Sequence, residues 1–363
     1  MEAEEGNTKA LCCRMLRWLR SASVRLLVAA LVGAVCLEVF TWTLFRWPDL
    51  WLGRIPQRMQ FQLLRYHFAY LTGTPVQFRP ECAEWDVELM YRLRPGSCRF
   101  ATDEFDTTVR VSPRGLREDQ EVNDPELLVL GDSFTLGWGV EREAAYPALI
   151  AQNLGIREVV VADSSYGTVR ESLLLRRLAL ADFKAVVIQY CWNDLQENMS
   201  YLKAGRHVSA PQSTYAEWVG ISARIADKRL LKRSRHWFSL VWSDVFGTRR
   251  ADPRASAPEH ARMFLQILEA FAADLRGRPV LVLVADAGDQ ESPFIQAVND
   301  LPKSPRLGPI RAIETGSLLS RTDFFQMDPH WKPSGHRIIA AAVEKGLSDL
   351  VPDLGRPEAP LPR

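Results

Sequence analysis

The stretch LLVLGDSFTLGWGV, residues 127–140, joins an apolar run to Gly131, Asp132 and Ser133. A short uncharged run of this kind predicts a buried strand of a parallel sheet. The residues after such a strand lie at its carboxyl end, where the ligands of open α/β sheets bind. Ser133 is therefore a candidate nucleophile, although Asp132 or Ser133 could instead simply cap the helix that follows. The stretch alone leaves both interpretations open.

The same alternation of apolar run and amphipathic helix recurs from Pro125 onward. Further strands are predicted at 158–163, 185–190 and 279–286, with helices through 144–155, 168–180 and 259–275. Continuous Val, Leu and Ile runs separated by helices are typical of a parallel sheet that is covered on both faces. The sequence thus predicts an α/β protein, a flavodoxin-like three-layer α/β/α sandwich with a parallel sheet.

The composition excludes some classes of function. The 363 residues carry a formal net charge of +1 and are 47% hydrophobic and 25% charged, which provides for a large core. No long basic tract interleaved with aromatic residues occurs, so nucleic acid is not an expected partner. No CxxC pair or HExxH helix offers a metal site, and neither a metal nor another cofactor is expected.

An apolar segment near the N-terminus, residues 26–45, has the length of a helix that spans a bilayer. It contains one charge, Glu38, and tryptophans lie near one end and arginines near the other, as at membrane interfaces. A buried core helix is the alternative. No small-x-small cleavage site follows it cleanly, so an uncleaved single-pass anchor is expected. More positive charges precede the segment than follow it, which predicts a cytoplasmic N-terminus and a periplasmic or extracellular remainder.

Five regions follow from these patterns. They are a cytoplasmic N-terminus (1–25), the transmembrane helix (26–45), an accessory segment with short strands (46–123), the α/β domain (124–350) with an insertion at 196–258, and a Pro-rich tail expected to be disordered (351–363). In the insertion, residues 228–250 could form a lid that meets an acidic substrate or lipid headgroups, or an amphipathic helix packed on the core. Cys82 and Cys98 could pair in an oxidising compartment or remain free thiols.

Polar residues follow each of the first three predicted strands and precede the last helix. They are Gly131, Asp132 and Ser133; DSSYGT with Gly167; Cys191, Trp192, Asn193 and Asp194; and Asp328 with His330, before a helix that Pro333 would start. Because the carboxyl ends of parallel strands share one edge of the sheet, these loops are expected to converge.

This set of residues has a candidate for every role in acyl transfer through a serine. Ser133 can act as nucleophile, His330 as the base that takes its proton, and Asp328 as the acid that orients the imidazole. The backbone N–H groups of Ser133 and Gly167 and the side chain of Asn193 can hold the developing oxyanion.

Each assignment has a structural alternative. Asn193 and Asp194 could only cap a turn, and Asp328 could belong to a plain Asp-Pro turn. His330 could be a core histidine, whereas His336, the neighbouring candidate base, lies inside the predicted final helix and suits the role poorly. Cys191 is interpreted as a small buried hydrophobic residue and not as a second nucleophile.

These blocks resemble those of the SGNH hydrolases, also called the GDSL esterase and lipase family. The matching residues are Gly131, Asp132 and Ser133 for the first block, Gly167 for the second, Asn193 for the third, and Asp328 with His330 for the last. The resemblance covers residues 125–350 approximately, and it implies the SGNH hydrolase fold and the site roles given above.

Two positions depart from the family's pattern. Cys191 stands where the third block usually has Gly, two residues before Asn. The last block reads D-x-H instead of D-x-x-H, with Met327 at the usual position of the acid. An acid two residues before the histidine, followed by Trp331, resembles the SGNH-like O-acetyltransferases of exopolysaccharide and peptidoglycan modification.

The resemblance implies a serine esterase that hydrolyses an acyl ester, with acetyl as the expected group, through an acyl-Ser133 intermediate. The apolar segment 26–45 would anchor this enzyme in a membrane. The expected partners are an acylated carbohydrate or lipid-like ester of the cell envelope and the membrane itself. Two alternatives stay open. One is an O-acetyltransferase that modifies an envelope polysaccharide beside polysaccharide-assembly proteins. The other is a non-catalytic glycan-binding protein, in which the bulk of Cys191 prevents the oxyanion pocket from working.

Overall fold

The computed structural model describes residues 2–47, 50, 54, 75–102, 104–118, 122–191, 193–225, 235, 242, 256–285, 291–326 and 328–355. The chain divides into two compact units, residues 1–70 with 227–248 and residues 71–226 with 249–363. The segment predicted as a lid, 228–250, lies outside the described residues apart from Arg235 and Trp242, and so does the tail after Gly355.

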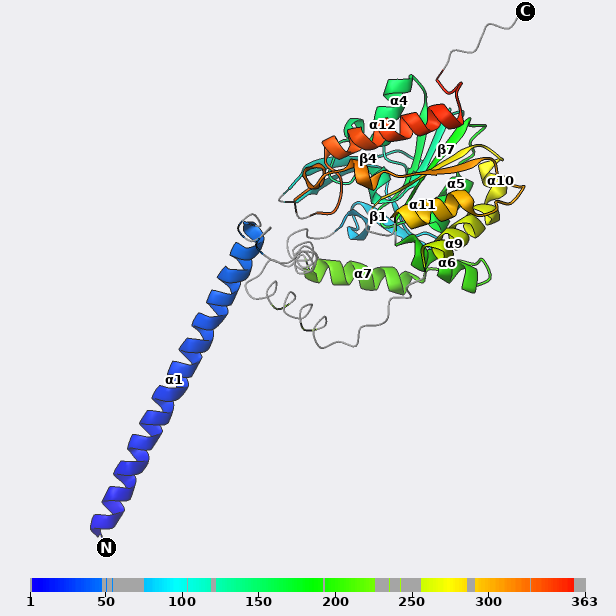
Figure 1. Ribbon diagram of the computed structural model, residues 1–363. Helices are drawn as coiled ribbons and strands as arrows, with labels where there is room; N and C mark the ends of the chain where they lie inside the picture. The colour runs from blue at the N-terminus through cyan, green and yellow to red at the C-terminus, as the bar shows by residue number, and fades with distance from the viewer. Residues whose placement is uncertain are drawn as a thin grey trace, which may run out of the picture. The chain divides into compact units, whose positions relative to one another are not determined.

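A long helix, α1 (Glu2–Arg46), makes up most of the described part of the first unit (Figure 1). Within it, Ala22–Leu44 spans 23 residues with a mean hydropathy of 2.1, and is long and apolar enough to cross a membrane. The predicted transmembrane segment, 26–45, overlaps this stretch almost completely. The helix also continues back to Glu2, through a region for which the sequence predicted no element.

The second unit is built on a five-stranded sheet with the order β6-β5-β7-β8-β9. The strands are β5 (Leu127–Gly131), β6 (Glu158–Ala162), β7 (Ala185–Tyr190), β8 (Val280–Val284) and β9 (Ile310–Ile313), and every neighbouring pair is parallel. Numbered along the chain, this is the 2-1-3-4-5 order of flavodoxin-like sheets. The first four strands confirm the prediction. The edge strand β9 was not predicted, because Arg311 interrupts its apolar residues and only one of its side chains is buried.

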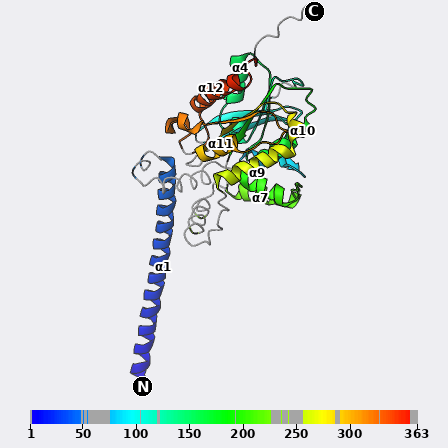
Figure 2. The same cartoon turned by 45° about the vertical axis from the view of Figure 1, so that its right-hand side comes forward.

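Alternate side chains of the strands enter two separate cores. Leu127 and Val129 pack with the helices α4 (Tyr146–Leu154) and α12 (Pro333–Leu350) on one face. Leu128 and Leu130 pack with α5 (Thr168–Arg177), α9 (Ala257–Ala270) and α11 (Glu291–Asp300) on the other. Figures 1 and 2 show these two layers of helices on opposite sides of the sheet. The predicted three-layer sandwich is therefore confirmed.

The described part of the second unit contains further helices. They are η2 (Val76–Phe78), α3 (Ser133–Leu136), η3 (Arg142–Ala144), α6 (Asp194–Lys203), α7 (Gln212–Ile225), α10 (Ala272–Leu275), η4 (Gly316–Leu318) and η5 (Arg321–Asp323). Much of α6 and all of α7 fall in the insertion at 196–258, where the sequence showed only that the strand and helix pattern lapses.

The accessory segment forms two antiparallel hairpins. The first pairs β1 (Ala83–Asp86) with β2 (Met90–Leu93), and the second pairs β3 (Gly96–Ala101) with β4 (Asp106–Val111). A disulfide between Cys82 and Cys98, whose Cα atoms are 5.5 Å apart, joins the two hairpins, so the structure decides between the two alternatives for these cysteines. Both hairpins belong to the same compact unit as the sheet.

Candidate functional site

The turn after β5 shows why a glycine, an acid and a hydroxyl follow the apolar strand. Asp132 is the N-cap of α3, and its Oδ1 accepts a hydrogen bond from the backbone N–H of Phe134 at 2.9 Å. Ser133 is the first residue of that helix, and its side chain is not needed for the cap. The capping interpretation thus holds for Asp132, and it leaves the hydroxyl of Ser133 available for another partner.

Gly131 is required because the turn packs directly against a side chain of β7. The backbone N–H of Asp132 and the hydroxyl of Thr135 both donate to Gln189 Oε1, at 3.0 and 2.9 Å. A Cβ atom on Gly131 would lie 2.0 Å from Thr135 Oγ1 and 2.6 Å from Gln189 Oε1. Any side chain at this position would therefore displace the groups that hold the turn against β7.

Ser133, His330 and Asp328 form a continuous chain of hydrogen bonds. The Oγ of Ser133 lies 2.7 Å from His330 Nε2, and His330 Nδ1 lies 2.5 Å from Asp328 Oδ1. All three residues are buried. Because Nδ1 is the nitrogen that can donate to the carboxylate, Nε2 is left as the acceptor for the Ser133 hydroxyl. This arrangement can transfer the Ser133 proton to the imidazole.

The acid at D-x-H spacing reaches the imidazole because the loop between η5 and α12 folds back on itself. Phe324 pairs with Trp331 in an antiparallel bridge, and the backbone N–H of Phe325 donates to the carbonyl of His330 at 3.0 Å. Asp328 lies inside this closed loop, and its Oδ1 also accepts the backbone N–H of His330 at 2.9 Å. Met327 lies outside the described residues.

Asp328 is held as an anion although it is buried. Burial by itself would raise the pKa of this carboxyl, but the neighbouring His330 and the donors of His330 and Trp138 outweigh it, so the pKa lies below its ordinary value. The Trp138 indole supplies one of these donors, since its Nε1 donates to Asp328 Oδ2 at 2.9 Å.

Two residues that sequence reasoning missed hold the acid and its loop. Trp138 contacts Asp328 as described, and the carboxylate of Glu104, between β3 and β4, accepts the backbone N–H groups of Gln326 and Asp328 at 2.6 and 2.9 Å. Glu104 gave no signal in the sequence, because it lies more than 200 positions from the loop that it binds. Trp138 stands between two glycines just after the GDS block, a feature that could have been noticed.

The predicted oxyanion residues lie at the starts of two neighbouring helices. Gly167 is the N-cap of α5 and Asn193 the N-cap of α6. The side-chain amide of Asn193 donates to the carbonyl of Tyr166 at 3.4 Å, and a Cβ on Gly167 would lie 3.2 Å from the Cα of Asp194. The Thr168 hydroxyl donates to Asp194 Oδ2 at 2.8 Å and joins the two helix starts. The structure therefore brings Gly167 and Asn193 side by side.

His336 and Cys191 occupy the positions that the sequence suggested. His336 is buried in α12, its Nδ1 accepts the backbone N–H of Tyr146 at 3.2 Å, and burial lowers its pKa to about 3. It is therefore neutral and does not join the chain of hydrogen bonds. Cys191 is a buried thiol directly after β7. Trp192 lies outside the described residues.

Several acids behind the site are buried and hold their protons more strongly than usual. Burial raises the pKa of Asp132 to about 6 and that of Asp163, which follows β6, to about 7. Burial and repulsion by neighbouring acidic groups raise the pKa values of Glu171 and Asp194 well above their ordinary range. At pH 7 Glu171 and Asp194 therefore keep their protons, whereas Asp328, whose pKa is lowered, is ionised.

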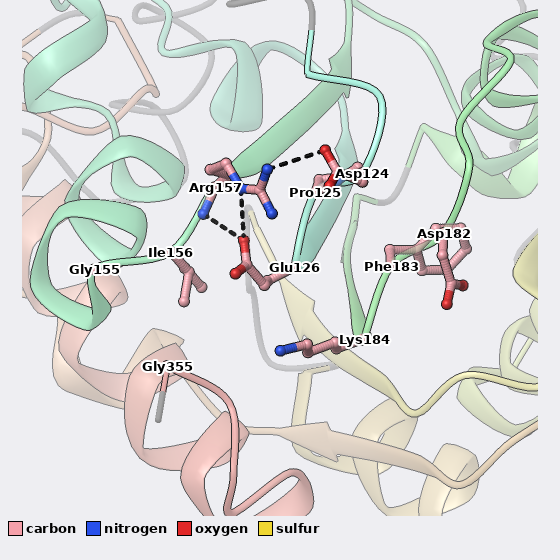
Figure 3. Close-up of a pocket in the computed structure, with 10 residues that line it drawn as sticks. All are labelled: Asp124, Pro125, Glu126, Gly155, Ile156, Arg157, Asp182, Phe183, Lys184 and Gly355. Carbon is pink, nitrogen blue, oxygen red and sulfur yellow. Dashed lines mark hydrogen bonds and ion pairs between the residues drawn. The ribbon is translucent and has the colours of Figure 1, made fainter. Parts of the chain in front are cut away.

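A cavity of about 530 Å³ lies at the opposite edge of the sheet, where β5, β6 and β7 begin (Figure 3). Its charged lining includes Arg157, which binds Asp124 at 3.0 Å and Glu126 at 3.2 Å, and Lys184. None of the predicted site residues lines it. The cavity is thus separate from the Ser133 site, which lies at the carboxyl ends of the same strands.

Neither a family model nor a curated protein sequence matches the chain. Similar solved structures include a carbohydrate esterase family 2 enzyme with a carbohydrate binding domain from Corynascus thermopiles (Myceliophthora fergusii), with 16% identity, 69% of this chain and 71% of that chain covered, and a TM-score of 0.38. A family two carbohydrate esterase from Clostridium thermocellum, in complex with cellohexaose, has 10% identity, 69% of each chain covered and a TM-score of 0.37.

A third similar structure, described as a lipolytic protein of the G-D-S-L family, comes from Desulfitobacterium hafniense DCB-2. It has 11% identity and a TM-score of 0.33, with 61% of this chain and 98% of that chain covered. Its description names the family whose motifs the present sequence resembles. The function proposed below rests on the side chains of this chain and not on these likenesses.

The contacts of Gly131 predict the effect of a single methyl group. We expect Gly131→Ala to lower the free energy of unfolding by about 1–3 kcal/mol, because the new Cβ overlaps Thr135 and Gln189. Thermal unfolding of the full-length protein in detergent measures this loss. The matched control is Gly220→Ala in α7, where the nearest atom to the new Cβ is 3.8 Å away. Equal melting temperatures for the two variants would contradict the interpretation.

The raised pKa of Asp163 predicts a dependence of stability on pH. Between about pH 4 and 7 the folded state keeps a proton on this carboxyl that the unfolded chain has released. The contribution of Asp163 to the free energy of unfolding is therefore present at about pH 4 and is lost as the pH rises through 7.

Asp163→Asn removes this ionisation. We expect the free energy of unfolding of the variant, relative to the wild type, to be higher at pH 8 than at pH 4 by about 1–4 kcal/mol. Urea unfolding followed by tryptophan fluorescence at the two pH values measures the difference. Asp300→Asn, at an exposed carboxyl that ends α11, is the control. A difference that is the same at both pH values would be evidence against a proton on Asp163.

Proposed function

We propose that the chain is a membrane-anchored serine esterase of SGNH/GDSL type. It hydrolyses an acyl ester of a cell-envelope carbohydrate, and the expected acyl group is acetyl. One observation carries the proposal. Ser133 Oγ, His330 and Asp328 are joined by hydrogen bonds of 2.7 and 2.5 Å at the carboxyl edge of the sheet. This is the order of groups that acyl transfer through a serine requires.

In the first step the Oγ of Ser133 attacks the carbonyl carbon of the ester. The hydroxyl proton passes to His330 Nε2, the Oγ–C bond forms, and the carbonyl π electrons move to the oxygen. When this intermediate collapses, the bond to the alcohol oxygen breaks, and the alcohol leaves with the proton from His330. Asp328 remains ionised throughout and compensates the positive charge of the imidazolium.

Water completes the cycle in the second step. His330 takes a proton from water as the water oxygen attacks the acyl-Ser133 carbonyl. When this second intermediate collapses, the bond to Ser133 Oγ breaks and His330 returns the proton to Oγ, which releases the carboxylic acid and free Ser133. In both steps the negative carbonyl oxygen needs donors. We assign these to the backbone N–H groups of Ser133 and Gly167 and to the side chain of Asn193, which together can offer three N–H donors to one oxygen.

The envelope substrate and the location follow from separate observations. Ala22–Leu44 can anchor the chain in a membrane, and the Cys82–Cys98 disulfide suits an oxidising compartment beyond it. With the N-terminus in the cytoplasm, the catalytic unit lies on the periplasmic or extracellular side, where envelope glycans are the available esters.

A second candidate function uses the same acyl-enzyme. The acid that binds His330 stands at D-x-H spacing, which resembles the SGNH-like O-acetyltransferases. In this case the hydroxyl of a sugar replaces water in the second step and receives the acyl group. The atoms balance in the same way, since His330 takes the proton of that hydroxyl.

The first test removes the nucleophile. We expect Ser133→Ala to lower kcat for an aryl acetate by about a thousandfold or more, since no other hydroxyl is bonded to His330 Nε2 in the described residues. A fluorophosphonate probe should label the wild type and not the variant. Ser348→Ala, an exposed serine of α12, is the control and should retain turnover and labelling. Full activity of Ser133→Ala would remove the serine from the mechanism.

The same preparation distinguishes the two functions. Acetylated envelope glycans and free glycan acceptors are supplied together, and the products of the wild type and of Ser133→Ala are compared. Free acetate that is independent of the acceptor indicates the esterase. Acetyl groups transferred to the acceptor at the expense of acetate indicate the transferase. A wild type that neither turns over esters nor reacts with the probe would favour the non-catalytic alternative.

A further inference from the structure

Trp138 contacts each member of the Ser133, His330 and Asp328 chain. Its backbone N–H donates to the carbonyl of Ser133 at 2.9 Å, and its indole Nε1 donates to Asp328 Oδ2 at 2.9 Å. Its ring stacks on the imidazole of His330, with centroids 4.9 Å apart and planes inclined by 19°. The residue is only 4% exposed.

The indole N–H of Trp138 donates a hydrogen bond to the Asp328 carboxylate oxygen that accepts none from His330. Asp328 Oδ1 receives both donors of His330, its Nδ1 and its backbone N–H, whereas Oδ2 receives Trp138. A planar carboxylate with donors on both oxygens is fixed in rotation as well as in position. Because His330 Nδ1 bonds to this carboxylate, the orientation of the imidazole ring is fixed as well. Its other nitrogen, Nε2, is then held towards the hydroxyl of Ser133.

The loop that carries Trp138 is built tightly around it. Gly137 and Gly139 on either side have φ values of +82° and +76°, in the left-handed region that glycine tolerates. The buried guanidinium of Arg117 donates to the carbonyls of Leu136, Gly137 and Val140. The ring of Phe100 packs edge-on against Trp138 at 4.4 Å. The indole is therefore held in one place by groups outside the chain of hydrogen bonds.

We propose that Trp138 is a positioning residue of the proposed esterase: its indole N–H orients the Asp328 carboxylate, and its ring face stabilises the imidazolium that His330 becomes when it takes the Ser133 proton. This inference rests on the proposed function. An aromatic face within about 6 Å attracts a cation, and the indole ring stacks on the imidazole at this range. Trp138 touches no substrate in this role and acts through Asp328 and His330.

A double-mutant cycle tests the orienting role. Trp138→Phe keeps an aromatic ring and removes the N–H, and Asp328→Ala removes its acceptor. In the wild-type background we expect Trp138→Phe to lower kcat for an aryl acetate about 10- to 100-fold, the effect of one hydrogen bond to a charged group, with KM changed less than about threefold. In the Asp328→Ala background the same change should cost less than about twofold.

Trp331→Phe is the matched control. Trp331 is buried next to His330 in the sequence, but its indole N–H has no hydrogen-bond partner within the described part of the chain. We expect this variant to keep kcat within about threefold of the wild type, because it loses no hydrogen bond. If Trp138→Phe fails to fold, replacement of the indole by benzothiophene, which has the same shape without the N–H, serves in the cycle.

These experiments distinguish a failure of the Trp138 role from a failure of the proposed esterase function. A cost of Trp138→Phe that is equal in both backgrounds, or an unchanged kcat in the wild-type background, would overturn the positioning role while the esterase stands. A wild type whose turnover does not depend on Ser133 would instead overturn the proposed function, and with it the role of Trp138. A large cost confined to the background that retains Asp328 supports the inference.

Discussion

The Asp328 carboxylate is the constraint around which the site is arranged. A buried anion costs several kcal/mol unless donors replace the water that it has lost. Here three N–H groups do so, two from His330 and one from Trp138. Because the donors come from two different loops, satisfying this one charge brings the loop after β5 and the loop before α12 together. Ser133 and His330 then meet as a consequence.

The accessory hairpins act on this arrangement from outside the sheet. The second hairpin supplies Glu104, which binds two backbone N–H groups of the Asp328 loop, and Phe100, which packs on Trp138. The first hairpin supplies Tyr91, whose hydroxyl donates to the carbonyl of Ser164 in the loop that leads to Gly167. The disulfide links the two hairpins. The accessory hairpins contribute no proposed catalytic residue, but they hold the loop of Asp328 and the loop that leads to Gly167.

The two ends of the parallel strands carry different kinds of polar residues. At the amino edge, charged side chains such as Arg157 and Glu126 pair with one another around a cavity. At the carboxyl edge, polar groups are buried and linked into directed hydrogen bonds, as in the contacts of Gln189 with Asp132 and Thr135. Such buried networks favour a single arrangement, because each unmade bond would leave a desolvated polar group. Reactive groups need that fixed geometry, and they lie at this edge.

The sequence by itself determined four of the five strands, β5 to β8, the helices between them and the order of the loops at the carboxyl ends of the strands. Uninterrupted apolar runs such as 127–131 have no other stable place than a sheet covered on both faces, so local pattern suffices for them. It also predicted Ser133, His330 and Asp328 as a set, since these residue types follow strands or precede a helix start that local signals reveal. The edge strand β9, with its exposed Arg311, had no such pattern.

Only the tertiary structure decided which groups hold that set in place. The contacts of Glu104 with the Asp328 loop and of Trp138 with Asp328 Oδ2 join positions 190 or more residues apart. The disulfide of Cys82 with Cys98 joins two separate hairpins. Nothing in the local sequence fixes such contacts, because they depend on how separate elements pack and on which buried polar atoms then need a partner.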